Sequence, residues 1–225
     1  IPSLRDPVDV EERPGQLWVA WSMESEANYP CLADPAFMQQ FDLTMTYRRD
    51  ADVWTPYFGP DTLAELQAPP QAKTESALAV YFASNPRDLS GRDRYVSELM
   101  QHLAVDSYGR CLHNRTLAAD EGRHSKLETL GRYKFTLAFE NSIERDYVTE
   151  KFFDALCAGS VPIVLGAPNI AEFAPSPGCW LDVADFSGPA ALAERIVGLC
   201  EDEQAYAAML RWKSAGVSDA FRALA

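Results

Sequence analysis

Two basic side chains fall at the openings of predicted helices, each after a predicted strand. Lys151 lies in the first turn of a helix expected over 148–159, and Arg92 opens a helix expected over 92–103. A helix N-terminus carries a partial positive charge, so a cation there is destabilising by about 0.3–1 kcal/mol unless an anion offsets it. Because the free N–H groups at a helix start also bind phosphate, these positions predict a phosphate site.

A simpler interpretation of Lys151 is an ordinary ion pair on a solvated helix face. Glu144, Glu150 and Asp154 are all near enough in the sequence to serve as its partner. The spacing alone fits both interpretations.

The segment 133–166 would position Lys151, and its pattern is typical of a strand, a polar loop, a helix and a second strand. Apolar residues alternate over 135–139, and the run stops at Glu140. The helical face that starts at Val148 ends at Gly159, and the apolar run 161–165 is typical of a strand buried on both faces. Such a βαβ unit binds ligands at the carboxyl ends of its strands.

The sequence from 139 to 178, FENSIERDYVTEKFFDALCAGSVPIVLGAPNIAEFAPSPG, resembles the donor-binding signature of the α1,3-fucosyltransferases. That family transfers fucose from GDP-fucose to a glycan. The plant-type enzymes that fucosylate the innermost GlcNAc of N-glycans are particularly similar, and the matches run in order from about Trp21 to the last residue. They include SMES (22–25), QAKTESALA (71–79), DSYGRCLHNR (106–115), APNIAEFAPSPG (167–178) and LRWKSAGVSDAFRAL (210–224).

The resemblance implies that Glu24, in the loop after a strand expected over 16–21, is the catalytic base. A sugar hydroxyl is a poor nucleophile, so a carboxylate within hydrogen-bond reach must take its proton. It also implies that Arg92 and Lys151 hold the diphosphate of the donor. Asn141, Tyr147 and Glu150 are then expected to bind hydroxyl groups of the fucose or ribose.

The expected fold class is α/β, because strands and helices alternate from about Ala77 onward as in a doubly wound, Rossmann-like domain. The resemblance implies the GT-B type of glycosyltransferase. The range 59–73 contains three Pro and no sustained periodicity, so it is the expected boundary between an N-terminal acceptor-side domain (1–72) and a C-terminal GDP-fucose-binding domain (73–225). The N-terminal α/β domain looks short or truncated, which puts the acceptor site in doubt.

The composition excludes some classes of partner. A net charge of −13 argues against nucleic acid, whose binding depends on Lys and Arg. No apolar run approaches the length of a membrane span. The resemblance implies a type II protein of the Golgi lumen whose membrane anchor is missing from this chain. Asn114-Arg115-Thr116 is a glycosylation sequon.

No essential metal is expected, although stimulation by Mn²⁺ is compatible with the resemblance. Asp50-Ala51-Asp52 matches the DxD pattern with which other glycosyltransferases hold a metal, but the family neutralises phosphate with cationic side chains, so we interpret it as structural. His102, His113 and His124 are spaced too widely for a local metal site. The five Cys show no zinc spacing and allow at most two disulfides.

The sequence thus predicts an enzyme that transfers L-fucose from GDP-β-L-fucose, with inversion, to the 3-hydroxyl of GlcNAc. The preferred acceptor is the Asn-linked core GlcNAc of an N-glycan. Two alternatives stay open: a Lewis-type α1,3-fucosyltransferase acting on lactosamine, and a GDP-sugar-binding remnant without catalysis. A soluble nucleotide-binding regulator on the same α/β plan is a further rival, and donor binding that ignores the fucose would favour it.

Overall fold

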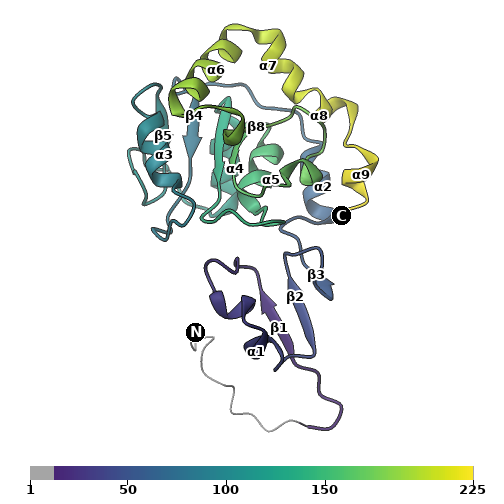
Figure 1. Cartoon of the computed structure of the whole chain (residues 1–225). Coiled ribbons are helices and arrows are strands. Elements are labelled where there is room, and N and C mark those ends of the chain that lie inside the picture. The colour runs from purple at the N-terminus through teal and green to yellow at the C-terminus, as the bar shows by residue number, and fades with distance from the viewer. Residues whose placement is uncertain (1–12, 225) are drawn as a thin grey trace.

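Two separate parallel sheets organise the chain, one in each of two units (Figure 1). The computed structural model describes residues 13–224. The smaller sheet contains β1 (Val19–Ser22), β2 (Leu43–Thr46) and β3 (Val53–Trp54), in that order. The 3-10 turn η1 (Pro30–Ala33) and the short helix α1 (Pro35–Met38) connect β1 to β2. This N-terminal unit is therefore a small α/β arrangement.

The larger sheet has five parallel strands in the order β5-β4-β6-β7-β8. Their bounds are β4 (Ala79–Tyr81), β5 (Val105–Ser107), β6 (Phe135–Phe139), β7 (Val161–Leu165) and β8 (Leu181–Asp182). Every residue of β6 is buried, as expected of a central strand with helices on both faces. The predicted strand–helix–strand unit over 133–166 is confirmed as β6, α5 and β7.

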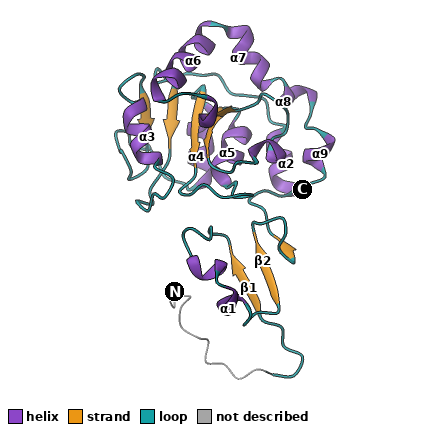
Figure 2. Cartoon of the chain, in the orientation of Figure 1, coloured by secondary structure: helices purple, strands orange, loops and turns teal. Residues whose placement is uncertain are grey.

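Helices cover both faces of the larger sheet (Figure 2). One face packs against α3 (Arg92–Leu99), α6 (Pro189–Glu201) and α7 (Glu203–Leu210). The other packs against α4 (Arg123–Gly131) and α5 (Glu150–Ala158), with α2 (Pro60–Leu66), α8 (Trp212–Ala215) and α9 (Asp219–Arg222) in the same cluster. The 3-10 turns η2 (Ile170–Phe173) and η3 (Val183–Asp185) flank β8. The predicted α/β class, with a doubly wound C-terminal unit, is confirmed.

Local signals account for helix α5. Thr149 is its N-cap and accepts a hydrogen bond from the Lys151 N–H at 3.4 Å. Gly159 ends it with a φ of 68°, the left-handed conformation predicted for that position. Helix α3 is shorter than the prediction over 92–103, but Leu103 still packs into the core.

The range 59–73, predicted to be irregular, contains helix α2. Pro60 occupies its first turn, where the missing N–H needs no partner. Leu66 is fully buried in the cluster that includes α5. The Lys213 Nζ donates to the carbonyl oxygens of Leu66 at 2.9 Å and Leu156 at 2.8 Å, which ties α2 to α5. These contacts are distant in sequence, so periodicity did not reveal them. The domain boundary at 72/73 stays a prediction.

Direct contacts join the two units. The Ser25 and Ser142 hydroxyl oxygens lie 2.6 Å apart. The rings of Tyr47 and Tyr147 meet edge to face, with centroids 4.9 Å apart. The sites built where the units meet are therefore set by tertiary packing.

All five cysteines are free thiols. Within residues 13–224, no helix has both the length and the apolar character needed to cross a bilayer.

The sequon residue Asn114 is bound to edge strand β5 through both ends of its amide. Its Oδ1 accepts from the Ser107 N–H at 2.7 Å, and its Nδ2 donates to the Val105 carbonyl at 2.9 Å. We expect Asn114→Ala to lower the free energy of unfolding by about 1–3 kcal/mol, because two strand groups lose their partners. Urea unfolding of bacterially produced protein measures this change in the free energy of unfolding.

Thr116→Ala is the matched control, because it also destroys the sequon but leaves the Asn114 amide in place. A loss of stability in the Thr116 variant equal to that in the Asn114 variant would contradict the structural role of the amide.

Candidate active site

A cavity of about 320 Å³ lies where the two units meet, at the carboxyl ends of β4 and β6. All six residues singled out from the sequence line it, together with Tyr57, Thr149 and the segment 82–85. The six are Glu24, Arg92, Asn141, Tyr147, Glu150 and Lys151. The structure therefore brings together side chains that come from three distant parts of the chain.

The strand order explains the position of this cavity. The chain runs from β4 to β5 on one side of β4 and then returns to β6 on its other side. Connections that leave two adjacent strands in opposite directions open a crevice beyond their carboxyl ends, where ligands bind in doubly wound folds. Helix α3 follows β4 and helix α5 follows β6, so both predicted helix starts open at this crevice.

Arg92 is a buried cation with little negative charge beside it. Its side chain is 2% exposed, and its guanidinium donates to the carbonyl oxygens of Phe139 at 3.2 Å and Asn85 at 2.8 Å. Its Nε has no hydrogen-bond partner among the described residues, and the nearest carboxylate oxygen, on Asp93, is 3.8 Å away. A buried charge is stable only when it is paired, so this arrangement favours an anionic ligand.

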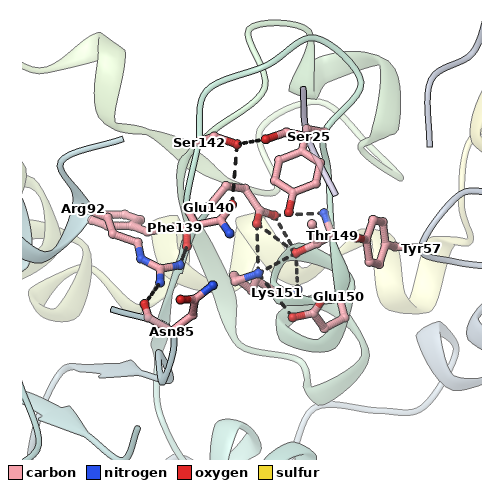
Figure 3. Close-up of polar contacts among 12 residues, drawn as sticks. Ser25, Tyr57, Asn85, Arg92, Phe139, Glu140, Ser142, Thr149, Glu150 and Lys151 are labelled. Atoms are coloured by element: carbon pink, nitrogen blue, oxygen red, sulfur yellow. Dashed lines mark hydrogen bonds and ion pairs between the residues drawn. The ribbon is translucent and has the colours of Figure 1, made fainter. Parts of the chain in front are cut away.

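Lys151 is held between two carboxylates (Figure 3). Its Nζ lies 3.0 Å from Glu140 Oε2 and 3.3 Å from Glu150 Oε1, and it also donates to Thr149 Oγ1 at 2.9 Å. Burial alone would lower the pKa of Lys151, but the charges of Glu140 and Glu150 outweigh it and raise the pKa. Lys151 is therefore fully charged at neutral pH.

The structure bears on the ion-pair interpretation of Lys151, whereas its binding of phosphate stays a prediction. Glu150 is a partner, as the simpler interpretation predicted, and Lys151 also lines the cavity. Asp154 is not a partner, because it pairs with Arg123 and Lys126 at 2.8 Å each. Burial opposes ionisation of Glu150, but the charges of Lys151 and Lys126 and the hydrogen bond from Lys151 together outweigh it and lower the pKa of that carboxyl group.

Glu140 is the site residue that the sequence analysis missed. Its side chain is 4% exposed, and it accepts hydrogen bonds from the Thr149 N–H at 2.9 Å and the Thr149 hydroxyl at 2.8 Å. A Cβ at position 166 would lie 3.0 Å from Glu140 Cγ, so glycine there leaves room for the Glu140 side chain. The available signal was a carboxylate placed directly after a predicted strand.

We expect Glu140→Gln to make binding of the predicted donor nucleotide, GDP, depend on pH. Without the Glu140 charge, burial lowers the pKa of Lys151, so the variant loses its cation at a pH where the wild type retains it. The GDP affinity of the variant relative to the wild type should fall by up to about tenfold between about pH 6.5 and about pH 9. Calorimetric titration at several pH values measures this ratio. A ratio independent of pH would contradict the role given to Glu140.

Glu24 reaches the cavity from the N-terminal unit. Its Oε2 accepts hydrogen bonds from the Tyr147 hydroxyl at 3.2 Å and the Asn28 Nδ2 at 3.1 Å. Burial, together with the nearby carboxylates, raises the pKa of Tyr147, so the phenol keeps its proton and donates it. Glu24 is thus held in the wall of the cavity that Arg92 and Lys151 also line.

Asn141 and Tyr57 also line the cavity of about 320 Å³. Asn141 is 5% exposed and is the second residue after β6, and its carbonyl oxygen accepts from the Leu89 N–H at 2.8 Å. Burial raises the pKa of Tyr57, whose hydroxyl donates to the Met23 carbonyl beside Glu24. Binding of sugar hydroxyls by Asn141, Tyr147 and Glu150 stays a prediction.

A second cavity, of about 280 Å³, adjoins the first and shares Glu24 as a wall residue. Leu32, Met38, Tyr47 and Arg48 also line it, so it combines apolar surface with charge. It lies entirely within the N-terminal unit.

The two carboxylates of the DxD pattern are engaged within the N-terminal unit. Asp50 accepts two hydrogen bonds from the Arg48 guanidinium, at 2.9 and 2.8 Å, and Asp52 accepts from the Thr44 N–H and hydroxyl at 2.8 Å each. Among residues 13–224, no three His, Cys, Asp or Glu residues are grouped so that they could hold a metal ion.

Two family models match this chain. Residues 71–222 match the model described as glycosyltransferase family 10 (fucosyltransferase), C-terminal, and residues 2–58 match the fucosyltransferase N-terminal model. Together they account for most of the sequence.

Similar proteins agree with these matches. A fucosyltransferase-like protein of Arabidopsis thaliana is 43% identical over 95% of the chain, which covers 41% of that protein. The human 4-galactosyl-N-acetylglucosaminide 3-alpha-L-fucosyltransferase FUT6 is 40% identical over 89% of the chain and 55% of its own length. The chain thus spans about half the length of these relatives. A crystal structure of an α1,3-fucosyltransferase with GDP-fucose has a TM-score of 0.65 at 21% identity, covering 90% of this chain and 68% of that one.

Proposed function

The chain belongs to glycosyltransferase family 10, the fucosyltransferases, and we propose that it transfers L-fucose from GDP-fucose to the 3-hydroxyl of a GlcNAc residue. One observation carries the proposal most directly. Arg92 and Lys151 line a single cavity together with Glu24, and the carboxylate oxygen nearest to the Arg92 cation is 3.8 Å away, on Asp93. That arrangement has the charges needed for a nucleotide diphosphate and the base needed for an attacking hydroxyl.

The proposed reaction is a single displacement at the anomeric carbon of fucose. The acceptor oxygen forms a bond to that carbon while the bond to the β-phosphate oxygen breaks, and the hydroxyl proton passes to the Glu24 carboxylate. GDP leaves with the bonding electrons, and Arg92 and Lys151 stabilise the charge that develops on it. In-line attack on a β-linked donor gives an α-linked product.

Asn141, Tyr147 and Glu150 are proposed to bind hydroxyl groups of the donor. Glu150 is well suited to this role, since the nearby Lys151 and Lys126 help to lower its pKa, so it is ionised and able to accept hydrogen bonds. Tyr147 lines the cavity, and its hydroxyl donates to Glu24. These residues would orient the fucose relative to the base.

We place the acceptor in the adjoining cavity of the N-terminal unit. Glu24 is in the wall between the two cavities, so an acceptor hydroxyl entering from that side meets the base first. Sugars bind by apolar contact combined with hydrogen bonds to charged groups, and Tyr47, Met38 and Arg48 offer both. The core GlcNAc of an N-glycan is the acceptor that the plant-type motifs favour, and lactosamine is the alternative.

The test is transfer of labelled fucose onto an N-glycopeptide with exposed core GlcNAc, with lactosamine assayed in parallel. We expect α1,3-linked fucose on the core GlcNAc. Transfer to lactosamine alone would favour the Lewis-type alternative. Binding of GDP-fucose without transfer to either acceptor would identify a non-catalytic donor-binding protein, and binding that ignores the fucose would favour a nucleotide-binding regulator.

We propose that the two cations replace a metal in this reaction, and that Mn²⁺ at most stimulates it. Transfer in excess EDTA should remain within about twofold of the rate with Mn²⁺, because Arg92 and Lys151 supply the positive charge that stabilises leaving GDP. Comparison of the initial rates of transfer in the two buffers measures this dependence on metal. Loss of transfer in EDTA, restored by Mn²⁺, would contradict this proposal.

The family also suggests the Golgi lumen as the site of action. Imaging the tagged natural protein against a Golgi marker tests this.

A further inference from the structure

Asn28 is a buried amide that contacts the proposed base. It closes the tight turn after β1, where its N–H donates to the Ser25 carbonyl at 3.0 Å. Its side chain is directed back toward Glu24, with Nδ2 3.1 Å from Glu24 Oε2. The residue is 3% exposed, so this amide is shielded from solvent.

The orientation of the amide is determined by Glu24. A reversed amide would place two oxygens against one another, so Nδ2 must face the carboxylate. Asn28 Oδ1, at the other end, is buried without a hydrogen-bond partner among the described residues. Buried polar atoms are nearly always paired, and a side chain kept for packing alone would not leave an acceptor unpaired. The bond to Glu24 is therefore the one hydrogen bond that the Asn28 side chain makes within the described part of the chain.

The two donors to Glu24 converge on the same oxygen. Asn28 Nδ2 and the Tyr147 hydroxyl both bind Oε2, while Oε1 accepts no hydrogen bond from any residue in the described part of the chain. One carboxylate oxygen is thus anchored from both units, and the other is free. The free oxygen is the one available to a hydroxyl group in the cavity.

We propose that Asn28 is a positioning residue, which together with Tyr147 holds Glu24 Oε2 so that Oε1 receives the proton of the acceptor hydroxyl. This inference rests on the proposed transferase function. It assigns different tasks to the two oxygens of one carboxylate: Oε2 fixes the geometry, and Oε1 is the base.

A purely structural role for the Asn28 side chain is the competing explanation. The turn is already held by main-chain bonds, because the N–H groups of Asn28 and Tyr29 both donate to the Ser25 carbonyl at 3.0 Å. The Ser25 hydroxyl also anchors the turn to Ser142 at 2.6 Å. None of these bonds needs the Asn28 amide, so its replacement should leave the turn intact.

The kinetic test compares Asn28→Asp and Asn28→Ala with the wild type. Asp has the shape of Asn but cannot donate when ionised, and its charge repels Glu24. We expect kcat for transfer to fall by about 100-fold in Asn28→Asp and by less in Asn28→Ala, because the base is no longer held in line. KM for GDP-fucose should stay within about threefold, because Asn28 does not line the donor cavity.

Gln40→Glu is the matched control, since it makes the same amide-to-carboxylate change at an exposed position of the N-terminal unit. It should leave kcat unchanged. Equal kcat values in wild type, Asn28→Asp and Asn28→Ala would overturn the proposal. A higher KM for GDP-fucose with unchanged kcat would also overturn it. If the wild type itself transfers no fucose, the proposed function fails. The measurement described next then tests whether the Asn28 amide binds Glu24.

That second measurement does not require turnover. The side-chain amide signals of Asn28 are assigned in ¹H–¹⁵N spectra by their loss in Asn28→Asp. We expect one amide proton to be shifted downfield and protected from exchange, and to lose both properties in Glu24→Ala. Identical shifts and exchange rates in the wild type and in Glu24→Ala would overturn the proposal whatever the transfer assay shows.

Discussion

Glu24→Gln is expected to lower kcat for fucose transfer by roughly 10²–10⁴-fold, the usual contribution of a positioned general base. Glutamine keeps the shape of the side chain and an oxygen that can accept from Tyr147 and Asn28. The affinity for GDP should therefore stay close to that of the wild type. Initial rates at saturating donor, together with calorimetric titration of GDP, separate the two effects.

Glu194→Gln is the control for this variant, because it makes the same change at an exposed position of α6. Its kcat should equal that of the wild type. A Glu24 variant that keeps kcat within about tenfold of the wild type would mean that another group takes the proton.

Lys151→Met is expected to weaken GDP binding by about 2–5 kcal/mol, because a partly buried cation is removed from the proposed diphosphate site. The variant should also lose folding stability, since Glu140 is left as a buried carboxylate without its cation. Calorimetry gives the first quantity and urea unfolding the second.

Lys126→Met separates the loss of binding from the loss of stability. The Lys126 side chain is 20% exposed and pairs with a buried carboxylate at 2.8 Å, while that of Lys151 is 19% exposed and pairs at 3.0 Å. Lys126 does not line the cavity. Its variant should lose stability yet bind GDP like the wild type. Equal GDP affinities in the two variants would remove Lys151 from the donor site.

Much of the C-terminal unit could be predicted because its signals are local. The apolar alternation over 135–139 and the glycine at 159 each specify an element within a few residues. Parallel strands then bring Arg92 and Lys151 to one edge of the sheet, so their positions at helix starts predicted a common site. The roles of Glu24, Asn141 and Tyr147 came from the family resemblance, not from spacing.

What escaped prediction depends on contacts between distant segments. Helix α2 is stabilised by burial of Leu66 and by Lys213, far along the chain. In the sequence, Glu140 cannot be told apart from a surface carboxylate at the end of a strand. Only the fold shows that it accepts hydrogen bonds from Thr149 and binds Lys151. The bond from Tyr147 to Glu24 is likewise set by the packing of the two units.

A crystal structure of this chain with GDP-fucose tests the central claim most directly. We predict the diphosphate within hydrogen-bond distance of Arg92 and Lys151, and the anomeric carbon of fucose on the side of the cavity that faces Glu24. Donor bound in the adjoining cavity beside Tyr47 and Arg48, or bound with its diphosphate away from both cations, would contradict it.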